Sequence, residues 1–198
     1  MKIRKIALCV LALTLVGGAT AGASEVIQTW KGKRIGVSVN DSPLDGGGIQ
    51  IDGRTYVPLR SISNTLQALI KLDPSTDAVH IYKPNVHLML FTGDKNAMKP
   101  FGNVYQGTYE FFVFAQVDNL ETKVHSIKTA VVDPSGQTVD TQVYDLSDDT
   151  KDTFWYTTAP YKIDFKSTGE YKVQFFIRQS EEQNFELVSE KAILSMKK

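Results

Sequence analysis

The sequence has one cysteine and three histidines in 198 residues, and it has no excess of either charge. The cysteine, Cys9, lies in the apolar N-terminal stretch, so the rest of the chain has no disulfide framework and no thiol nucleophile. Acidic and basic residues number 22 each. A chain this close to neutrality lacks the basic surface with which proteins bind nucleic acids or anionic membranes. We therefore expect structure that depends on an apolar core, and no nucleic-acid partner.

Sequence motifs that carry catalysis or bind metal are also missing. There is no G-x-S-x-G elbow, no H-E-x-x-H helix, no P-loop and no dinucleotide fingerprint. His80, His87 and His125 lie on predicted strands without a ligand partner at metal-binding spacing. The sequence therefore predicts a protein that is not an enzyme and holds no metal or other cofactor. A glycosidase that uses two carboxylates is the enzymatic alternative, although no pair of acids can be chosen from the sequence.

Residues 1–23 have the pattern of a secretory signal peptide. A positively charged start is followed by a short apolar stretch at 6–16 and by small residues that end in AGA at 21–23, a typical cleavage site. An uncleaved anchor is disfavoured because glycines interrupt the segment, and a lipid anchor on Cys9 because the preceding Leu8 is large. No later apolar run approaches membrane-spanning length. We expect a secreted or envelope-associated chain with no membrane span after cleavage.

The segment 34–82 predicts a small sheet packed on one helix. Apolar and polar residues alternate along 34–40, and Asp52-Gly53 predicts a tight hairpin between strands at 49–51 and 55–57. Pro58 suits the first turn of a helix, and the turn at 73–77 separates short strands at 70–72 and 78–82. Four apolar residues are spaced as one buried helical face: Leu59, Ile62, Leu66 and Leu69.

The same segment contains the stretch IDGRTYVPLR at 51–60, which resembles the signature of the copper amine oxidase N-terminal (stalk) domain family. The resemblance extends over about 34–82 and includes the later hairpin with AVHI at 78–81. Asn64 and Gln67 depart from it, where the family usually has an acidic residue and a glycine near the helix end. The resemblance implies a module of secreted bacterial proteins. It implies neither copper nor amine oxidation, because the catalytic domain is absent.

Two arginines of this segment, Arg54 and Arg60, are candidate binding residues. One interpretation is that they cap turns and pair with nearby carboxylates such as Asp52 or Asp73. The other is that they form a fork that recognises a phosphate or carboxylate of the cell wall.

The second half of the chain predicts a β-sandwich similar to bacterial immunoglobulin-like domains. Strands are expected at 109–117, 126–132, 138–144, 154–158, 171–177 and 185–194, with a tight turn at 133–136. The segment 92–104 lacks helix or strand periodicity and is interpreted as a boundary. The expected organisation is a signal peptide at 1–23, a stalk-like domain at 30–92 and an immunoglobulin-like domain at 104–198, which is a mainly β fold.

Two further features of the second half are candidate binding sites. The loop 145–152 contains four carboxylates, which suits either a solvated loop or a weak calcium site. In the strand that follows, alternation requires either Trp155 or the Phe154 and Tyr156 pair to face away from the core. An exposed aromatic stacks on sugars or contacts a protein partner, and so Trp155 and Tyr156 join the candidate binding residues.

These observations favour an exported, non-enzymatic interaction or structural module of the cell envelope, with a cell-wall polymer or an envelope protein as its partner. A glycan- or peptidoglycan-binding protein that uses exposed aromatic residues of the sandwich is the alternative.

Overall fold

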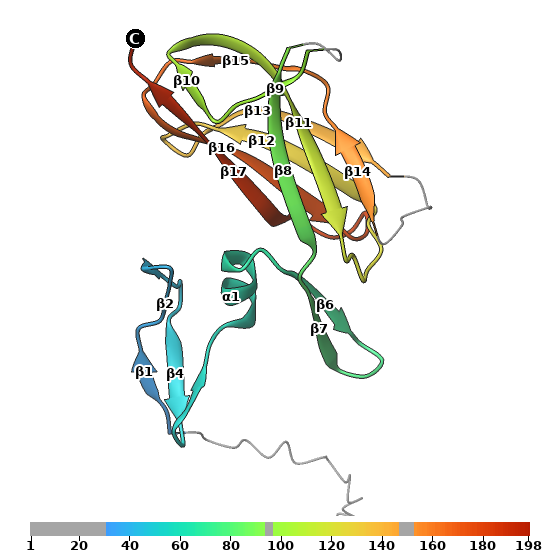
Figure 1. Ribbon diagram of the computed structural model, residues 1–198. Coiled ribbons are helices and arrows are strands. Elements are labelled where there is room, and N and C mark those ends of the chain that lie inside the picture. The colour runs from blue at the N-terminus through green and yellow to red at the C-terminus, as the bar shows by residue number, and fades with distance from the viewer. Residues whose placement is uncertain (1–30, 94–96, 147–152) are drawn as a thin grey trace, which may run out of the picture. The chain divides into compact units, whose positions relative to one another are not determined.

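The computed structural model describes residues 31–93, 97–146 and 153–198 (Figure 1). The predicted signal peptide and most of the acidic loop lie outside the described residues. The N-terminal part consists of β1 (Lys33–Ile35), β2 (Ser38–Val39), β3 (Ser42–Pro43), β4 (Gly48–Ile51), β5 (Arg54–Tyr56), α1 (Leu59–Thr65), β6 (Leu69–Asp73) and β7 (Ala78–Tyr82). Strands β1, β4 and β5 form an antiparallel sheet, and β2–β3 and β6–β7 are two-stranded pairs.

The tight hairpin at Asp52-Gly53 is confirmed. Ile51 of β4 pairs with Arg54 of β5, and the two residues between them have φ values of 48° and 75°. Both values lie in the left-handed region that a two-residue hairpin of the primed type requires, and glycine enters this region without steric cost. The second turn between predicted strands, at 133–136, is also confirmed, with Gly136 at φ 85° and its N–H bonded to Asp133.

Helix α1 is shorter than the sequence predicts, and the predicted buried face is wrong at two of its four positions. The helix ends at Thr65, and Gln67 adopts a φ of 55°, a conformation that favours glycine. Leu66 therefore leaves the helical face and is exposed, while Leu69 begins β6 and is buried. Leu59 is exposed as well, and Pro58 is the N-cap residue rather than part of the first turn. No helix in the described part of the chain is long and apolar enough to cross a bilayer.

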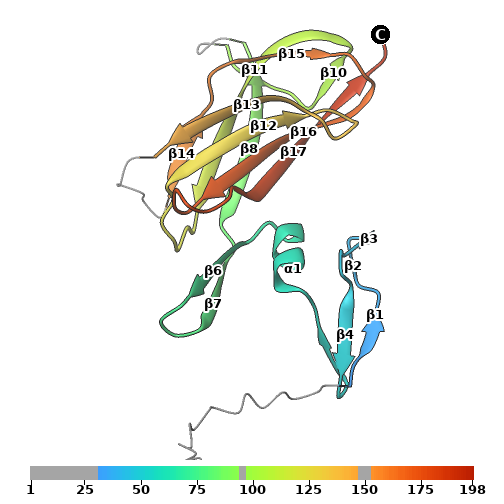
Figure 2. The ribbon, with the colours of Figure 1, turned by 180° about the vertical axis from the view of Figure 1, so that it is seen from behind.

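The remaining strands form two sheets layered face to face, which Figure 2 shows from behind. They are β8 (Asn85–Thr92), β9 (Lys99–Pro100), β10 (Asn103–Tyr105), β11 (Gly107–Asp118), β12 (Ser126–Val132), β13 (Thr138–Asp145), β14 (Phe154–Thr157), β15 (Tyr161–Phe165), β16 (Gly169–Arg178) and β17 (Glu186–Met196). One sheet has the order β10-β17-β16-β12-β13. The other has the order β14-β11-β8-β9, with β15 also paired to β11. The mainly β fold, a small α+β module followed by an immunoglobulin-like sandwich, is confirmed.

The core of the sandwich lies between the two sheets because each strand alternates buried and accessible side chains. In β11, Phe111, Val113 and Val117 are buried, and in β16 the residues from Tyr171 to Ile177 alternate in the same way. Tyr161 of β15 is fully buried and joins the two sheets: its hydroxyl lies 2.5 Å from Thr129 Oγ1 on β12. A polar bond between the layers thus crosses the core.

The six predicted strands of the second half are confirmed, but β8, β9, β10 and β15 were not predicted. Strand β8 lies before the expected boundary at 92–104, yet it pairs with β11 from Asn85 to Phe91. Its alternation is hard to recognise in the sequence because Met89 and Phe91, on the face away from the core, are apolar too. The proposed domain limits stay a prediction, and β8 itself is a strand of the sandwich.

Candidate functional site: an apolar groove on the outer sheet face

The face of the sheet β14-β11-β8-β9 that points away from the core is unusually apolar. Phe112 and Phe114 of β11 lie on this face, between the buried Phe111, Val113 and Ala115. The register places Phe91 of β8 opposite Phe112, and Met89 opposite Phe114. Residues directly opposite one another in neighbouring strands have side chains in contact range. Four apolar side chains from two strands therefore form one continuous patch.

Ring contacts extend the patch across three strands. The Phe91 and Phe112 rings are stacked with centroids 5.7 Å apart, and the Phe114 ring lies 6.1 Å from that of Trp155 on β14. Trp155 is 69% exposed, whereas Phe154 and Tyr156 pack against the core from the same strand. Of the two arrangements that strand alternation allowed, the structure has Trp155 outward. Tyr156 is half-buried and its ring lies 5.3 Å from that of Tyr144.

The patch is hollowed into a cavity of about 990 Å³, which we call the outer groove. Its apolar lining includes Met89, Phe91, Met98, Phe112, Phe114 and Pro160. Polar groups are few: the groove is also lined by Glu110, Thr157 and Thr158, and the hydroxyl of Thr158 already accepts a hydrogen bond from the Val113 N–H. A cavity of this size and character suits an organic ligand or a set of partner side chains.

The predicted binding residues do not form one site. Trp155 borders the outer groove through its contact with Phe114, and Tyr156 faces the other way. Arg54 lies in β5 and Arg60 in α1, and both are exposed. The sequence reasoning missed the groove residues of β8 and β11. A signal for them is present in the sequence, because 88–91 and 111–114 are continuous apolar runs. In a strand, such a run places apolar side chains on both faces of the sheet.

The expected pairing of the arginines with Asp52 or Asp73 is not observed among the described residues. The Asp73 carboxylate instead accepts hydrogen bonds from the Ser75 hydroxyl and N–H, and these bonds lower its pKa. The positive charge of Arg60 instead influences the carboxylate of Glu186. Burial raises the pKa of Glu186, while a hydrogen bond from the Ile70 N–H and the charge of Arg60 partly oppose this effect.

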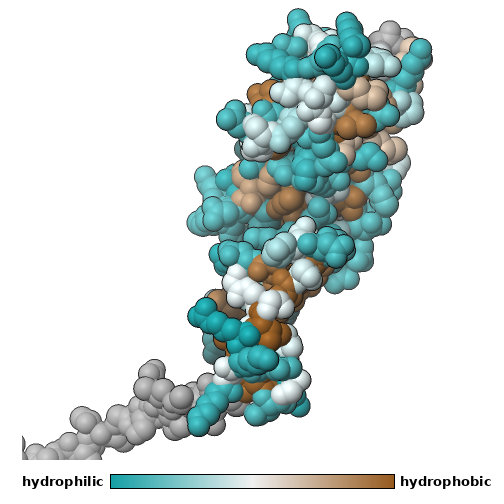
Figure 3. All heavy atoms as spheres, turned by 90° about the vertical axis from the view of Figure 1, so that its left-hand side faces the viewer, coloured by the Kyte–Doolittle hydropathy of each residue, from teal (hydrophilic) through white to brown (hydrophobic). Residues whose placement is uncertain are grey.

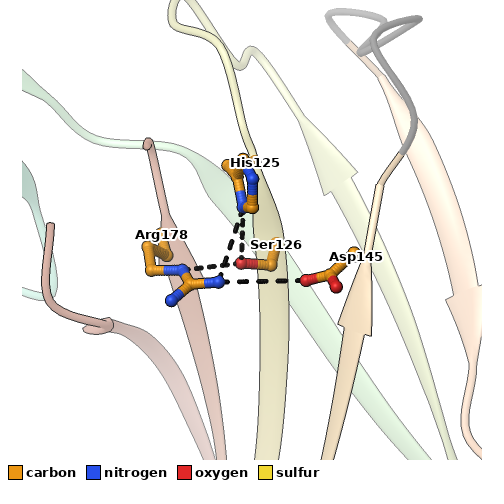
Figure 4. Close-up of polar contacts among 4 residues, drawn as sticks. All are labelled: His125, Ser126, Asp145 and Arg178. Carbon is orange, nitrogen blue, oxygen red and sulfur yellow. Dashed lines mark hydrogen bonds and ion pairs between the residues drawn. The ribbon is translucent and has the colours of Figure 1, made fainter. Parts of the chain in front are cut away.

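A polar cluster joins the ends of β12, β13 and β16 (Figure 4). The Arg178 Nε donates to Ser126 Oγ at 2.8 Å, and Ser126 Oγ lies 3.1 Å from His125 Nδ1. Arg178 Nη2 lies 3.5 Å from the same His125 nitrogen and 3.9 Å from Asp145 Oδ1. Because arginine only donates, Ser126 accepts from Arg178, and the tautomer of the His125 ring determines which group donates between Ser126 and His125. Ser126 is fully buried, so its hydroxyl is inaccessible to a substrate, and the cluster is a structural one.

We expect Arg178→Met to lower the free energy of unfolding by about 1–2 kcal/mol, since it leaves the buried Ser126 hydroxyl with one partner fewer. The matched control is Lys172→Met, which removes the more exposed bridge to Glu190 and should cost about 0.5 kcal/mol. Urea unfolding of both variants measures the difference. Equal losses would contradict a special role for the buried hydroxyl.

No group of three or more metal-ligating side chains occurs in the part of the chain that the structure describes. Of the acidic loop, only Asp145 and Leu146 are described, and Asp145 contacts Arg178. The structure therefore adds no support for a metal site, and the calcium hypothesis falls largely on residues outside the description.

Exposed apolar residues also occur on the N-terminal module, the lower coloured region of Figure 3. They include Ile49, Tyr56, Leu66, Leu72, Val79 and Ile81. Tyr56 of β5 is therefore on the surface of the module. These residues lie on a sheet, a helix end and a hairpin, whereas the outer groove gathers its apolar side chains on one sheet face.

Fold and site together define a mainly β protein in which a small α+β module precedes a sandwich with an apolar outer groove. Residues 38–107 match the family model of the copper amine oxidase N-terminal domain, and this confirms the resemblance seen in 34–82. The matched segment extends through β8 to the first residue of β11. The family is named for the N-terminal domain of those enzymes and not for their catalytic domain. No curated protein matches the chain.

Proposed function

We propose that the chain is an exported, non-enzymatic interaction module of the cell envelope that binds a partner through the outer groove. The observation that carries this proposal is the groove itself, in which apolar side chains from β8, β11 and the segments around them surround about 990 Å³. Monomeric proteins rarely expose large continuous apolar surfaces to water, and such surfaces usually mark binding sites. The signal-like N-terminus supports export, and the match to an N-terminal domain supports a non-catalytic role.

A protein partner fits the groove better than a glycan does. Sugars present hydroxyl groups around their whole perimeter, and a buried hydroxyl without a hydrogen-bond partner costs about 1–3 kcal/mol. Among the described residues, the groove supplies only Glu110, Thr157 and the already bonded Thr158 as polar lining. The exposed ring of Trp155 is the one observation that favours stacking on a sugar. Glycan binding therefore stays the second candidate.

The test compares binding of the full exported chain to purified cell wall and to envelope protein. A photo-crosslinking residue at position 114, in the groove, should capture envelope protein, and one at position 143 should not. Val143 is exposed on β13 of the other sheet and serves as the matched control. If the chain binds purified cell wall and Phe114→Ser binds it equally well, the proposal is contradicted, because binding then occurs through a different surface.

Trp155→Ala and Tyr156→Ala should differ because the two side chains face opposite ways. Trp155 is 69% exposed, so its removal should change the unfolding midpoint little while weakening partner binding. Tyr156 is half-buried against the core and contacts Tyr144, so its removal should cost about 1–3 kcal/mol. Thermal melts paired with binding assays separate the two. Equal destabilisation with unchanged binding would contradict a role for Trp155 at the interface.

A further inference from the structure

We infer that the outer groove takes a segment of a partner protein that carries apolar side chains next to a basic residue. This inference rests on the proposed function and names the chemistry of its partner. The composition of the groove and the position of the Glu110 carboxylate support it.

The apolar part of the groove has the composition of a protein interface core. Protein interfaces are enriched in aromatic residues and methionine and depleted of charge at their centre. The groove has Phe91, Phe112 and Phe114 on its floor, with Met89 and Met98 beside them. Methionine side chains are flexible and polarisable, and they adapt to partner side chains of different shape. We therefore expect apolar side chains of a partner segment to occupy this part of the groove.

The charged part of the lining is Glu110, two residues from Phe112 on the same face of β11. Its side chain is exposed and makes no ion pair with any described residue. Lys162 is opposite Glu110 in the register of β11 and β15, and the two side chains form no ion pair. The carboxylate is thus available to a basic residue of the partner, which would be attracted electrostatically at one end of the groove.

Two other occupants fit this arrangement less well. An anionic membrane surface would be repelled by the Glu110 carboxylate at the edge of the groove. A second copy of the chain in a two-fold arrangement would present the same apolar groove and the same carboxylate. The membrane surface supplies no positive charge for Glu110, and in a second copy the lysine of this face, Lys162, is already opposite that copy's own Glu110.

The experiment uses the full exported chain and two fluorescent peptides with the same apolar body, leucine-phenylalanine-leucine-glycine, one ending in lysine amide and one in glutamate amide. Fluorescence anisotropy should show the lysine peptide binding about two- to five-fold more tightly, as expected for an exposed charge pair. Glu110→Gln should abolish the preference, and Glu110→Lys should invert it. Phe114→Ser should weaken both peptides at least about ten-fold, and Val143→Ser should change neither.

The experiment distinguishes a failure of this inference from a failure of the proposed function. Equal binding of both peptides, with no effect of Glu110→Gln, would overturn the basic-residue inference and leave the groove as a binding site. Binding of neither peptide, together with crosslinking of envelope protein from position 114, would overturn the inferred occupant but not the proposed function. A dimer in sedimentation that Phe114→Ser dissociates, or binding to phosphatidylcholine vesicles, would assign the groove to a second copy or to lipid. Glu110→Gln is a surface change, so its result does not depend on whether Phe114→Ser folds.

Discussion

Phe111→Ala should lower the free energy of unfolding by about 3–5 kcal/mol, the typical cost of removing a buried phenylalanine. Phe111 is 1% exposed, and its ring lies 5.4 Å from that of Phe101, 5.6 Å from that of Tyr161 and 6.3 Å from that of Phe165. Truncation would leave a void among the aromatic rings of β15 and of the segment between β9 and β10, and a close-packed interior fills such a void poorly. Urea unfolding followed by tryptophan fluorescence measures the loss.

Phe112→Ala is the matched control, because the same residue type at the next position lies on the other face of β11. It loses mainly the stacked contact with Phe91, worth about 1 kcal/mol. Its larger effect should be on partner binding. Similar destabilisation by the two variants would contradict the assignment of opposite faces, and with it the position of the groove.

Tyr161→Phe should cost about 1–2 kcal/mol at neutral pH. The hydroxyl of Tyr161 lies 2.5 Å from Thr129 Oγ1 and also donates to the Thr129 carbonyl at 3.2 Å. Thr129 is 1% exposed, so water cannot replace the lost partner. Thermal unfolding of the variant beside Thr129→Val, which removes the other member of the pair, tests the bond. A double variant that costs no more than one single change would confirm that the two hydroxyls act together.

The same tyrosine predicts how stability depends on alkaline pH. Burial raises the pKa of Tyr161 to about 12, from 10.0 for an ordinary tyrosine. A raised pKa in the folded state means that the stabilisation is complete below about pH 10 and is lost as the pH rises towards 12. Each tenfold change in proton affinity is worth about 1.4 kcal/mol, so the protein should lose up to about 3 kcal/mol over this interval. Tyr161→Phe should lack this loss. Parallel pH profiles of the two proteins would contradict the assignment.

Much of the sandwich was predictable because one face of each strand is apolar and the other is polar. Strand β16, with Tyr171, Val173, Phe175 and Ile177 in the core, shows this alternation plainly. Turns were predictable where local chemistry determines them, as at Asp52-Gly53 and at 133–136. In the turn at 133–136, Asp133 Oδ1 accepts hydrogen bonds from the Ser135 hydroxyl and from two backbone N–H groups.

The groove was not predictable because it depends on register between strands distant in the sequence. Phe91 and Phe112 are brought together by pairing of β8 with β11, and Trp155 joins Phe114 through β14. The sequence predicts a helix that is longer than α1 for a different reason. The helical spacing of apolar residues continues through Leu66 and Leu69, but the backbone leaves the helix at Gln67. Helices often end at a glycine in the left-handed conformation, and a glutamine at this position gives no such signal in the sequence.

Strand β8 has a consequence for how such proteins diversify. It belongs to the segment that matches the N-terminal family, and it is also hydrogen-bonded into the sandwich along seven positions of β11. An exchange of the first half of the gene at the apparent boundary would therefore carry Met89 and Phe91 into the new protein and leave Phe112 and Phe114 behind. Half of the groove would travel with each fragment. The outer groove is thus kept intact only where β8 and β11 are inherited together, and an exchange at this boundary should disrupt it.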